Sequence, residues 1–398
     1  MKRLRNIGRL FTGTNVGVIE DAAVILDGEE IAWCGRHRDE PRELMEAVTD
    51  EHDCLGGLVT AGLIDAHTHP VYAGDRMAEV AMRSAGATYE QVAKAGGGIK
   101  ATVAATREES PDALEADTAR RLWTWLEGGA TTVEAKTGYL LTHEGELGAT
   151  RLLARLGQRA DLPRIEVTFL AAHALPPDRW ARYSSYAKQV AQWCDDAYLA
   201  GARFCDVFCD RGYFSVPQSR AILRAGIQAK LIPRIHADEL ARTGGARLAA
   251  ELHAVSADHL LRANRGDAVA MARAGVVATL APGTALSIGQ LPPVKELIDA
   301  GAVIALGTDH NPGTSGLTSM SAVVALAVAV FKMPVDRALL AATLGGAFSV
   351  SRSDRGVVAA HKLADLVAWD AEHEGAFAWA YGLKPRTVWL RGAQVFAP

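Results

Sequence analysis

From residue 58 onward, short apolar runs alternate with longer segments in which apolar residues recur at helical spacing. Eight such runs can be counted, and each is apolar at nearly every position, which is typical of parallel strands covered on both faces. They are LVTAGLIDAH, ATTVEAK, RIEVTFLAAH, RFCDVFC, KLIPRIH, AVSADH, VVATLAP and VIALGTD. Eight alternations of strand and helix predict an α/β fold, a (β/α)8 TIM-like barrel.

The segments between these runs carry helix signals. In SPDALEADTARRLWTWLEGG, Ser110 is a predicted N-cap, Pro111 occupies the first helical position and Gly128 follows the end. The most apolar stretch, residues 320–331, is too short to span a bilayer and is interpreted as a buried helix. The glycine-rich AGGGIK at residues 95–100 lacks the lysine and hydroxyl pair of a phosphate loop, so we expect a flexible loop near a helix start.

Both ends of the chain show a different pattern. Residues 18–35 contain two short β-like runs around Asp27 and Gly28, which is a hairpin signal. Residues 363–370 and 386–396 also have strand-like patterns. We therefore expect residues 1–57 and 356–398 to form one small β-sandwich domain, and residues 58–355 to form the barrel.

Composition limits the classes of function. The chain of 398 residues is 49% hydrophobic and 22% charged, as expected for a well-buried globular protein. Its net charge of −4 offers no basic surface for nucleic acid, and the basic start MKRLR is not followed by an apolar segment that would direct secretion. Five cysteines without CxxC pairs favour reduced thiols. We expect a cytoplasmic protein that binds neither nucleic acid nor membrane.

Histidines gather at the ends of the predicted strands. In a (β/α)8 barrel the chemistry lies at the carboxyl ends of the strands. The eight runs end in His67, Lys136, His173, Cys209, His236, His259, Pro282 and Asp309. The His-x-His pair of His67 and His69 is by itself compatible with chance, because the chain has 12 histidines. Four histidines and an aspartate at one rim instead favour a metal site.

Four of these side chains form a candidate ligand set: His67 and His69 from the first strand, His236 from the fifth and Asp309 from the eighth. Three imidazoles and one carboxylate suit zinc or ferrous iron with one position left for water. The fourth run ends in Cys209 and Asp210, with no lysine that could bridge a second ion after carboxylation, so we expect one ion.

Glu239 lies three residues after His236, just beyond a strand end. A carboxylate at this place can act as general base and proton shuttle for the attacking water. The alternative interpretation is a carboxylate that only interacts with the dipole of a helix N-terminus.

At these residues the sequence resembles the amidohydrolase superfamily, over most of its length. The motifs that carry the resemblance are TAGLIDAHTH, GATTVEAKTGY, FLAAHALP, DVFCDRGYFS, IHADEL, SADHL and GTDHNPGTS. The resemblance implies one Zn²⁺ or Fe²⁺/Fe³⁺ ion per chain, held by the same four ligands. It also implies that the catalytic residues are Glu239 as the base, His259 as a second polar group near the water, and Asp309.

Within the superfamily, the chain is similar to members that hydrolyse the ring amide of 4-imidazolone-5-propanoate to N-formimidoyl-L-glutamate in histidine degradation. The resemblance assigns substrate contacts to Arg76, Tyr139, His173, Glu239, Asn311, Gly313 and Thr314. The substrate carries a propionate, and the planar guanidinium of Arg76 is an apt anchor for a carboxylate.

Each of these residues also has a simpler interpretation. Alone, Arg76 would be a surface residue in a loop, His173 a structural residue of the rim, and Thr314 a turn or cap residue. Residues 285–293, ALSIGQLPP, differ from the usual loop of the similar proteins, which puts access to the site in question.

Two other functions are compatible with the motifs. A hydrolytic deaminase of a purine or pyrimidine-like ring would use the same ligands and base, but a neutral base offers no carboxylate to Arg76. A non-catalytic scaffold would keep the barrel, although the four ligands and Glu239 argue against it. The sequence leaves open the identity of the metal, and the resemblance is compatible with a homodimer.

Overall fold

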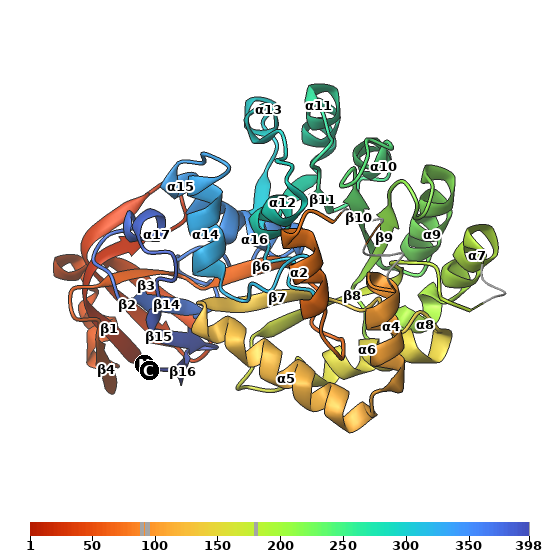
Figure 1. Cartoon of the computed structure of the whole chain (residues 1–398). Helices are drawn as coiled ribbons and strands as arrows, with labels where there is room; N and C mark the ends of the chain where they lie inside the picture. The colour runs from red at the N-terminus through yellow and green to blue at the C-terminus, as the bar shows by residue number, and fades with distance from the viewer. Residues whose placement is uncertain (88–90, 92–95, 179–181, 398) are drawn as a thin grey trace.

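A barrel of parallel strands fills the middle of the molecule, and a second sheet lies beside it (Figure 1). The computed structural model describes residues 1–87, 91, 96–178 and 182–397. The barrel strands follow one another in chain order, and each is parallel to its neighbours. They are β6 (Leu63–Thr68), β7 (Ala130–Lys136), β8 (Arg164–Ala172), β9 (Phe204–Cys209), β10 (Ile232–Ala237), β11 (Ser256–His259), β12 (Val277–Leu280) and β13 (Ile304–Leu306). Each predicted run contains one of these strands, so the (β/α)8 prediction is confirmed.

The barrel closes between its first strand and the segment that follows its last strand. A parallel bridge joins Thr68 to His310, and the His69 amide donates to the His310 carbonyl at 2.9 Å. The Asp309 amide donates to the His67 carbonyl, also at 2.9 Å. Because both closing segments carry predicted ligands, closure of the barrel brings those ligands together.

Helices surround the barrel strands (Figure 1). At α5 the predicted start is confirmed, because the Ser110 hydroxyl accepts a hydrogen bond from the Ala113 amide at 3.3 Å and Pro111 is the first helical residue. The helices of this layer are α2 (Met77–Ser84), α4 (Ile99–Glu108), α5 (Pro111–Glu127), α6 (His143–Leu156), α7 (Tyr183–Gln192), α8 (Cys194–Leu199), α9 (Val216–Gln228), α10 (Gly245–Glu251), α11 (Arg265–Ala274), α12 (Pro282–Ile288), α13 (Val294–Asp299), α14 (Met320–Ala329), α15 (Val335–Ala342) and α16 (Leu344–Ser349).

Two other helix expectations are also tested. The apolar segment at 320–331 forms α14, most of whose residues are buried. In AGGGIK, Gly98 is the N-cap of α4, so the expected helix start is present, whereas residue 95 lies outside the described residues. No described helix is both long and apolar enough to cross a membrane.

Strands from both chain ends make the second sheet, in the order β16-β15-β14-β5-β1-β2-β3, with β4 also paired to β1. The hairpin predicted at Asp27 and Gly28 joins β2 to β3. The strands are β1 (Lys2–Phe11), β2 (Val18–Asp27), β3 (Glu30–Arg36), β4 (Asp50–Asp53), β5 (Leu58–Ala61), β14 (Leu366–Trp369), β15 (Pro385–Leu390) and β16 (Ala393–Phe396). A 3-10 turn (His37–Asp39) and the short helices α1 (Arg42–Glu46) and α17 (Ala376–Trp379) accompany them.

The prediction that LVTAGLIDAH is a single strand is wrong. Its first half is β5, which pairs with β1 and β14 in the terminal sheet, and its second half is β6 of the barrel. The pattern could not show this break, because both halves are buried and apolar. The division into residues 1–57 with 356–398 and residues 58–355 stays a prediction, and the pairing of β5 favours a boundary at Gly62.

The two sheets are joined by continuous apolar packing. Leu58 of β5 and Trp369 of β14 belong to the same buried cluster as Leu122 and Trp125 of α5. The Trp369 indole also donates to the Thr60 hydroxyl at 3.0 Å. The terminal sheet therefore supports the strand that leads directly into the first pair of candidate ligands.

Candidate metal centre and active site

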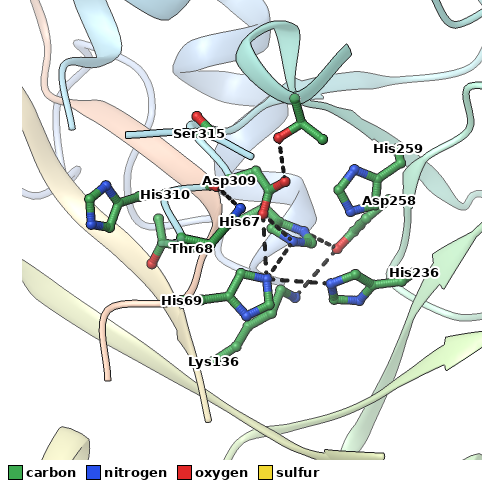
Figure 2. Close-up of polar contacts among 12 residues, drawn as sticks. His67, Thr68, His69, Lys136, His236, Asp258, His259, Asp309, His310 and Ser315 are labelled. Carbon is green, nitrogen blue, oxygen red and sulfur yellow. Dashed lines mark hydrogen bonds and ion pairs between the residues drawn. The ribbon is translucent and has the colours of Figure 1, made fainter. Parts of the chain in front are cut away.

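The four predicted ligands converge at the carboxyl end of the barrel (Figure 2). The Nε2 atoms of His67 and His69 lie 3.2 Å apart, and the His236 Nε2 lies 3.5 Å from that of His69. Asp309 Oδ1 lies 3.4 Å from the Nε2 atom of both His67 and His69. All four side chains are buried, so the structure brings together the set that the sequence predicts.

These atoms have the arrangement expected for a cation site. If the two imidazole nitrogens 3.2 Å apart both present lone pairs, a shared cation satisfies both at once. Groups of metal-competent atoms within 4.8 Å include His67, His69 and Asp309, and also His69, His173 and His236. Although burial opposes it, contacts with His67 and His69 hold the pKa of Asp309 well below its usual value. The residues fit one metal ion with nitrogen and oxygen ligands.

A layer of buried charges lies beneath the ligands. Asp258 Oδ2 lies 2.7 Å from His67 Nδ1, and Asp206 Oδ2 lies 3.0 Å from His236 Nδ1. The Lys136 ammonium donates to Asp206 at 2.7 Å and to Asp258 at 3.4 Å. Carboxylates on the far side of a ligand imidazole fix the orientation of its ring and raise its basicity. This layer therefore aims two of the histidines at the centre.

A hydrogen bond orients the Asp309 carboxylate, and the backbone of several site residues is strained. The buried Thr284 hydroxyl donates to Asp309 Oδ2 at 2.5 Å, which leaves Oδ1 toward the histidines. Asp309, Asp238 and His259 all have left-handed backbones, with φ of 46°, 52° and 72°. Such conformations are costly for residues other than glycine and occur often at functional sites.

Glu239, just after β10, and His259, the last residue of β11, face the same centre. Glu239 Oε2 lies 3.8 Å from His259 Nε2, and both side chains are buried. Burial raises the pKa of the Glu239 carboxyl above its usual value, although His259 acts in the opposite direction. Burial also lowers the pKa of His259. The pair therefore offers one carboxylate and one neutral imidazole for proton transfer.

A cavity of about 320 Å³ opens over this centre. Its polar lining includes most of the predicted site residues: His69, Arg76, Tyr139, His173, His236, Glu239, His259, Asp309, Asn311 and Thr314. Its apolar lining includes Ile99, Phe208 and Ile288. A concave cavity in which polar groups converge between apolar side chains is the usual form of a site for a small molecule, and the many polar groups here suit a polar one.

Comparisons with known proteins agree with this architecture. The sequence profile of the Amidohydrolase family matches residues 215–395. Imidazolonepropionase of Shouchella clausii is 40% identical over 93% of this chain and 84% of its own. The Streptomyces griseus enzyme of that name is also 40% identical, over 97% of this chain and 95% of its own. The chain belongs to the imidazolonepropionase family of amidohydrolases.

Solved structures at lower identity share the fold. An atrazine chlorohydrolase from Arthrobacter aurescens TC1, complexed with zinc, has a TM-score of 0.71 at 18% identity and covers 100% of this chain and 95% of its own. An adenosine deaminase from Xanthomonas campestris with bound zinc has a TM-score of 0.73 at 19% identity, with coverage of 100% and 93%. The imidazolonepropionase-family chain thus has the common amidohydrolase architecture.

Arg76, which the sequence resemblance predicts to bind the substrate carboxylate, already has an acidic partner. Its Nε and Nη2 donate to both carboxylate oxygens of Glu79, at 2.8 and 2.6 Å, and both side chains are buried. Glu79 Oε1 also accepts the Gly98 amide at 2.7 Å. The pair fixes the plane of the guanidinium at the cavity wall. This pairing was not predicted, because an i, i+3 contact depends on where the helix begins.

His173 and Tyr139 line the cavity beside His69. The His173 ring stacks on His69 with centroids 4.9 Å apart, and its Nδ1 donates to the Gly138 carbonyl at 3.1 Å. Burial lowers the pKa of His173 to about 3, so its ring is neutral and Nε2 is an acceptor. The Tyr139 ring packs against the His173 ring, with their centroids 5.1 Å apart.

The segment after Asp309 is held by its own side chains. Asn311 Oδ1 accepts the amides of Gly313 and Thr314, both at 2.8 Å, and its Nδ2 donates to the Asp309 carbonyl at 2.6 Å. The Asn311 amide, which is expected to contact the substrate, thus also stabilises this turn. Gly313 is not among the residues that line the cavity, but a Cβ there would lie 2.2 Å from Arg76 Nη1. Glycine at 313 therefore permits the close approach of Arg76.

Several residues of the site were not singled out from the sequence. Lys136 was noted only as a strand end, and the supporting roles of Asp206, Asp258, Glu79 and Thr284 were not predicted. A detectable signal exists for three of them, because Lys136, Asp206 and Asp258 are charged residues within strands that are buried along their whole length. The unusual segment at 285–293 does reach the site, since Ser287 and Ile288 line the cavity.

Proposed function

We propose that this hydrolase opens the ring amide of 4-imidazolone-5-propanoate to give N-formimidoyl-L-glutamate, a step in the degradation of histidine. The curated relatives at about 40% identity carry the name imidazolonepropionase. The observation that supports the proposal most directly is that His69, His236, Asp309, the Glu239 carboxylate and the Arg76 guanidinium all line one cavity of about 320 Å³, with His67 in contact with His69 and Asp309.

The proposed cofactor is one Zn²⁺ or Fe²⁺/Fe³⁺ ion per chain, held by His67, His69, His236 and Asp309. The solved atrazine chlorohydrolase and adenosine deaminase of the same fold contain zinc, which supports a metal cofactor here. When bound, such an ion polarises the amide carbonyl and makes water a stronger acid. The charged layer of Asp206, Asp258 and Lys136 would keep the ligand rings aligned in either case.

Glu239 is the proposed proton shuttle. As the oxygen of water bonds to the ring carbonyl carbon, the Glu239 carboxylate accepts the proton that water loses. The same group then returns a proton to the ring nitrogen as the carbon–nitrogen bond breaks. The His259 ring, whose Nε2 lies 3.8 Å from Glu239 Oε2, would form a second hydrogen bond to the reacting oxygen.

Other residues would orient the substrate. The Arg76 guanidinium, held flat by Glu79, would face the propionate, and the Tyr139 hydroxyl would be a further donor. The His173 Nε2 acceptor would receive a ring N–H, because its Nδ1 is committed to the Gly138 carbonyl. Asn311 and Thr314 would form the wall on the Asp309 side.

The competing functions differ in product. A deaminase of a purine or pyrimidine-like ring would release ammonia and leave the ring closed, and the relatives at about 40% identity do not favour it. A non-catalytic scaffold is disfavoured by the convergence of all four ligands with Glu239. Arg76 already pairs with Glu79, so its recognition of a propionate can be tested only with a substrate that carries the propionate.

The test is to add freshly prepared imidazolone propionate to the purified, metal-loaded protein and to follow the loss of the ring absorbance in the ultraviolet. We expect loss of absorbance that stops when the metal is removed by a chelator and returns when the metal is restored. Ammonia release from a nucleobase, without loss of imidazolone, would contradict the proposal. A homodimer and a cytoplasmic location stay predictions.

A further inference from the structure

A buried carboxylate behind the cavity holds the loop that carries Glu239. Asp210 follows β9 directly and is 3% exposed. Its Oδ2 accepts the amides of Glu239 and Leu240 at 2.7 and 2.8 Å, and its Oδ1 accepts the amide of Ala241 at 3.0 Å. Three successive backbone N–H groups therefore converge on one side chain from a neighbouring strand.

The donors of Asp210 are main-chain groups. A fourth amide, from Arg211, donates to Oδ1 at 2.6 Å, and no ion pair of Asp210 occurs among the described residues. Successive amides that point to one anion form a concave site with strong charge-assisted hydrogen bonds. In this protein the anion is supplied by the chain itself, so the amides of residues 239–241 are fixed by Asp210.

Other hydrogen bonds fix the rest of the loop that follows Glu239. The Asp238 carboxylate accepts the amides of Thr243, Gly244 and Ala246 at 2.7, 2.9 and 3.0 Å. The Thr243 hydroxyl donates to the Cys209 carbonyl at 3.2 Å. Asp238 acts within its own loop, whereas Asp210 connects the loop to β9. Among the described residues, Asp210 alone accepts a hydrogen bond from the amide of Glu239 itself.

Asp210 cannot act on the substrate directly, because Glu239 and Leu240 line the cavity and Asp210 does not. We propose that Asp210 is a positioning residue for the reaction, which keeps the Glu239 carboxylate aimed at the reacting bond by fixing the backbone of residues 239–241. This inference rests on the proposed function of Glu239 as proton shuttle. A displacement of about 1 Å at a catalytic group can cost on the order of a hundredfold in rate.

The test is a double-mutant cycle with Asp210→Asn and Glu239→Gln. Asparagine keeps the shape of Asp210 but replaces one acceptor oxygen by an NH₂ group that faces amide donors. We expect Asp210→Asn to lower kcat by about tenfold or more, with KM changed by less than about threefold. In the Glu239→Gln background the same change should have no further effect on kcat, because residues that act as a unit are not additive.

Glu146→Gln is the matched control. Glu146 is also buried, and it accepts the amides of Leu140 and Leu141 at 2.9 and 2.7 Å, in the loop that carries Tyr139. Because Tyr139 is proposed to bind substrate and not to transfer a proton, loss of these two hydrogen bonds should raise KM more than it lowers kcat. The opposite patterns of the two variants separate positioning of the base from a general loss of stability.

The outcomes are distinct. If Glu239→Gln keeps its kcat, the proposed function of Glu239 fails. If Glu239→Gln is inactive while Asp210→Asn has normal kcat, or if the two losses multiply, the inference about Asp210 fails alone. Should Asp210→Asn not fold, hydrogen exchange of the unchanged protein decides: slow exchange of the amides at residues 239–241 is expected, and exchange as fast as in exposed loops overturns the inference.

Discussion

Glu239 is deeply buried, and its proposed role as proton shuttle requires an ionised carboxylate. We predict that Glu239→Gln lowers kcat by about a hundredfold or more, because glutamine keeps the size of glutamate but cannot accept a proton. Metal content should stay unchanged. His259→Asn is the comparison, since its ring lies 3.8 Å away. Retention of most of the parent kcat in Glu239→Gln, with His259→Asn inactive and fully metallated, would assign the shuttle to His259.

The pH dependence follows from the same group. Burial raises the pKa of Glu239, and only the deprotonated form can act as a base. The rate constant kcat/KM should therefore fall as pH decreases through this raised pKa, at a pH above the range of an ordinary glutamate. His173, with a pKa of about 3, should not contribute to this acid limb. The residual rate of Glu239→Gln should lack the limb, and a limb that persists there would reject the assignment.

The Asp258 carboxylate, which contacts His67, should affect the affinity of the site for its metal and not only the reaction rate. We predict that Asp258→Asn weakens metal binding by about 10- to 100-fold, because the 2.7 Å contact with His67 Nδ1 is lost or weakened. Competition with a chelator of known affinity measures this. Asp267→Asn is the control, because Asp267 is equally buried but bonds to Arg242 and Arg247 outside the cavity. Equal affinities in both variants would contradict the role.

Arg76 is predicted to recognise the carboxylate of the substrate. Charge-assisted hydrogen bonds contribute roughly 1.5 to 3 kcal/mol, so Arg76→Met should lower kcat/KM at least about tenfold without loss of metal. The change also leaves Glu79 buried without this partner, 2.6 Å from the missing group. The double variant Arg76→Met with Glu79→Gln separates the two effects, because it should regain stability but not kcat/KM. Unaltered kinetics would exclude Arg76 from the site.

At the scale of elements, the strand ends were the most predictable part of the molecule. His67, His236 and His259 end apolar runs, and such runs are distinctive because buried parallel strands tolerate few polar residues. The sequence could not reveal contacts between elements. Asp258 contacts His67 across 191 residues of the chain, and Asp210 accepts the Glu239 amide across 29 residues. Such pairings depend on the three-dimensional arrangement of the strands.

Helix α16 packs closely against β13 near the centre. A Cβ added at Gly345 would lie 2.0 Å from the Ile304 carbonyl oxygen, at the strand that leads to Asp309. We predict that Gly345→Ala destabilises the protein by about 1 to 3 kcal/mol, seen as a lower Tm. Gly148→Ala is the matched control in α6, where nothing lies within 4 Å and alanine favours the helix. Equal Tm values would contradict the packing argument.

At the scale of the whole molecule, the terminal sheet and the barrel depend on a shared interface. Trp369 of β14 is fully buried at that interface and donates to Thr60. We predict that Trp369→Ala lowers stability by about 3 to 5 kcal/mol, as for other large core truncations. Trp379, which is 88% exposed, is the control, and Trp379→Ala should leave Tm nearly unchanged. Similar Tm values for the two variants would show that the sheet does not stabilise the barrel.

The pairing of β5 with β14 has a consequence during synthesis on the ribosome. Ala61 finds its antiparallel partner in Leu366, near the opposite end of the chain, and β5 leads directly into the strand that carries His67. At about 5 to 20 residues per second, the edge of β5 stays unpaired for on the order of 15 to 60 seconds while the barrel emerges. An unpaired strand edge is a template for aggregation, so the nascent chain carries its greatest risk before its last strands leave the ribosome.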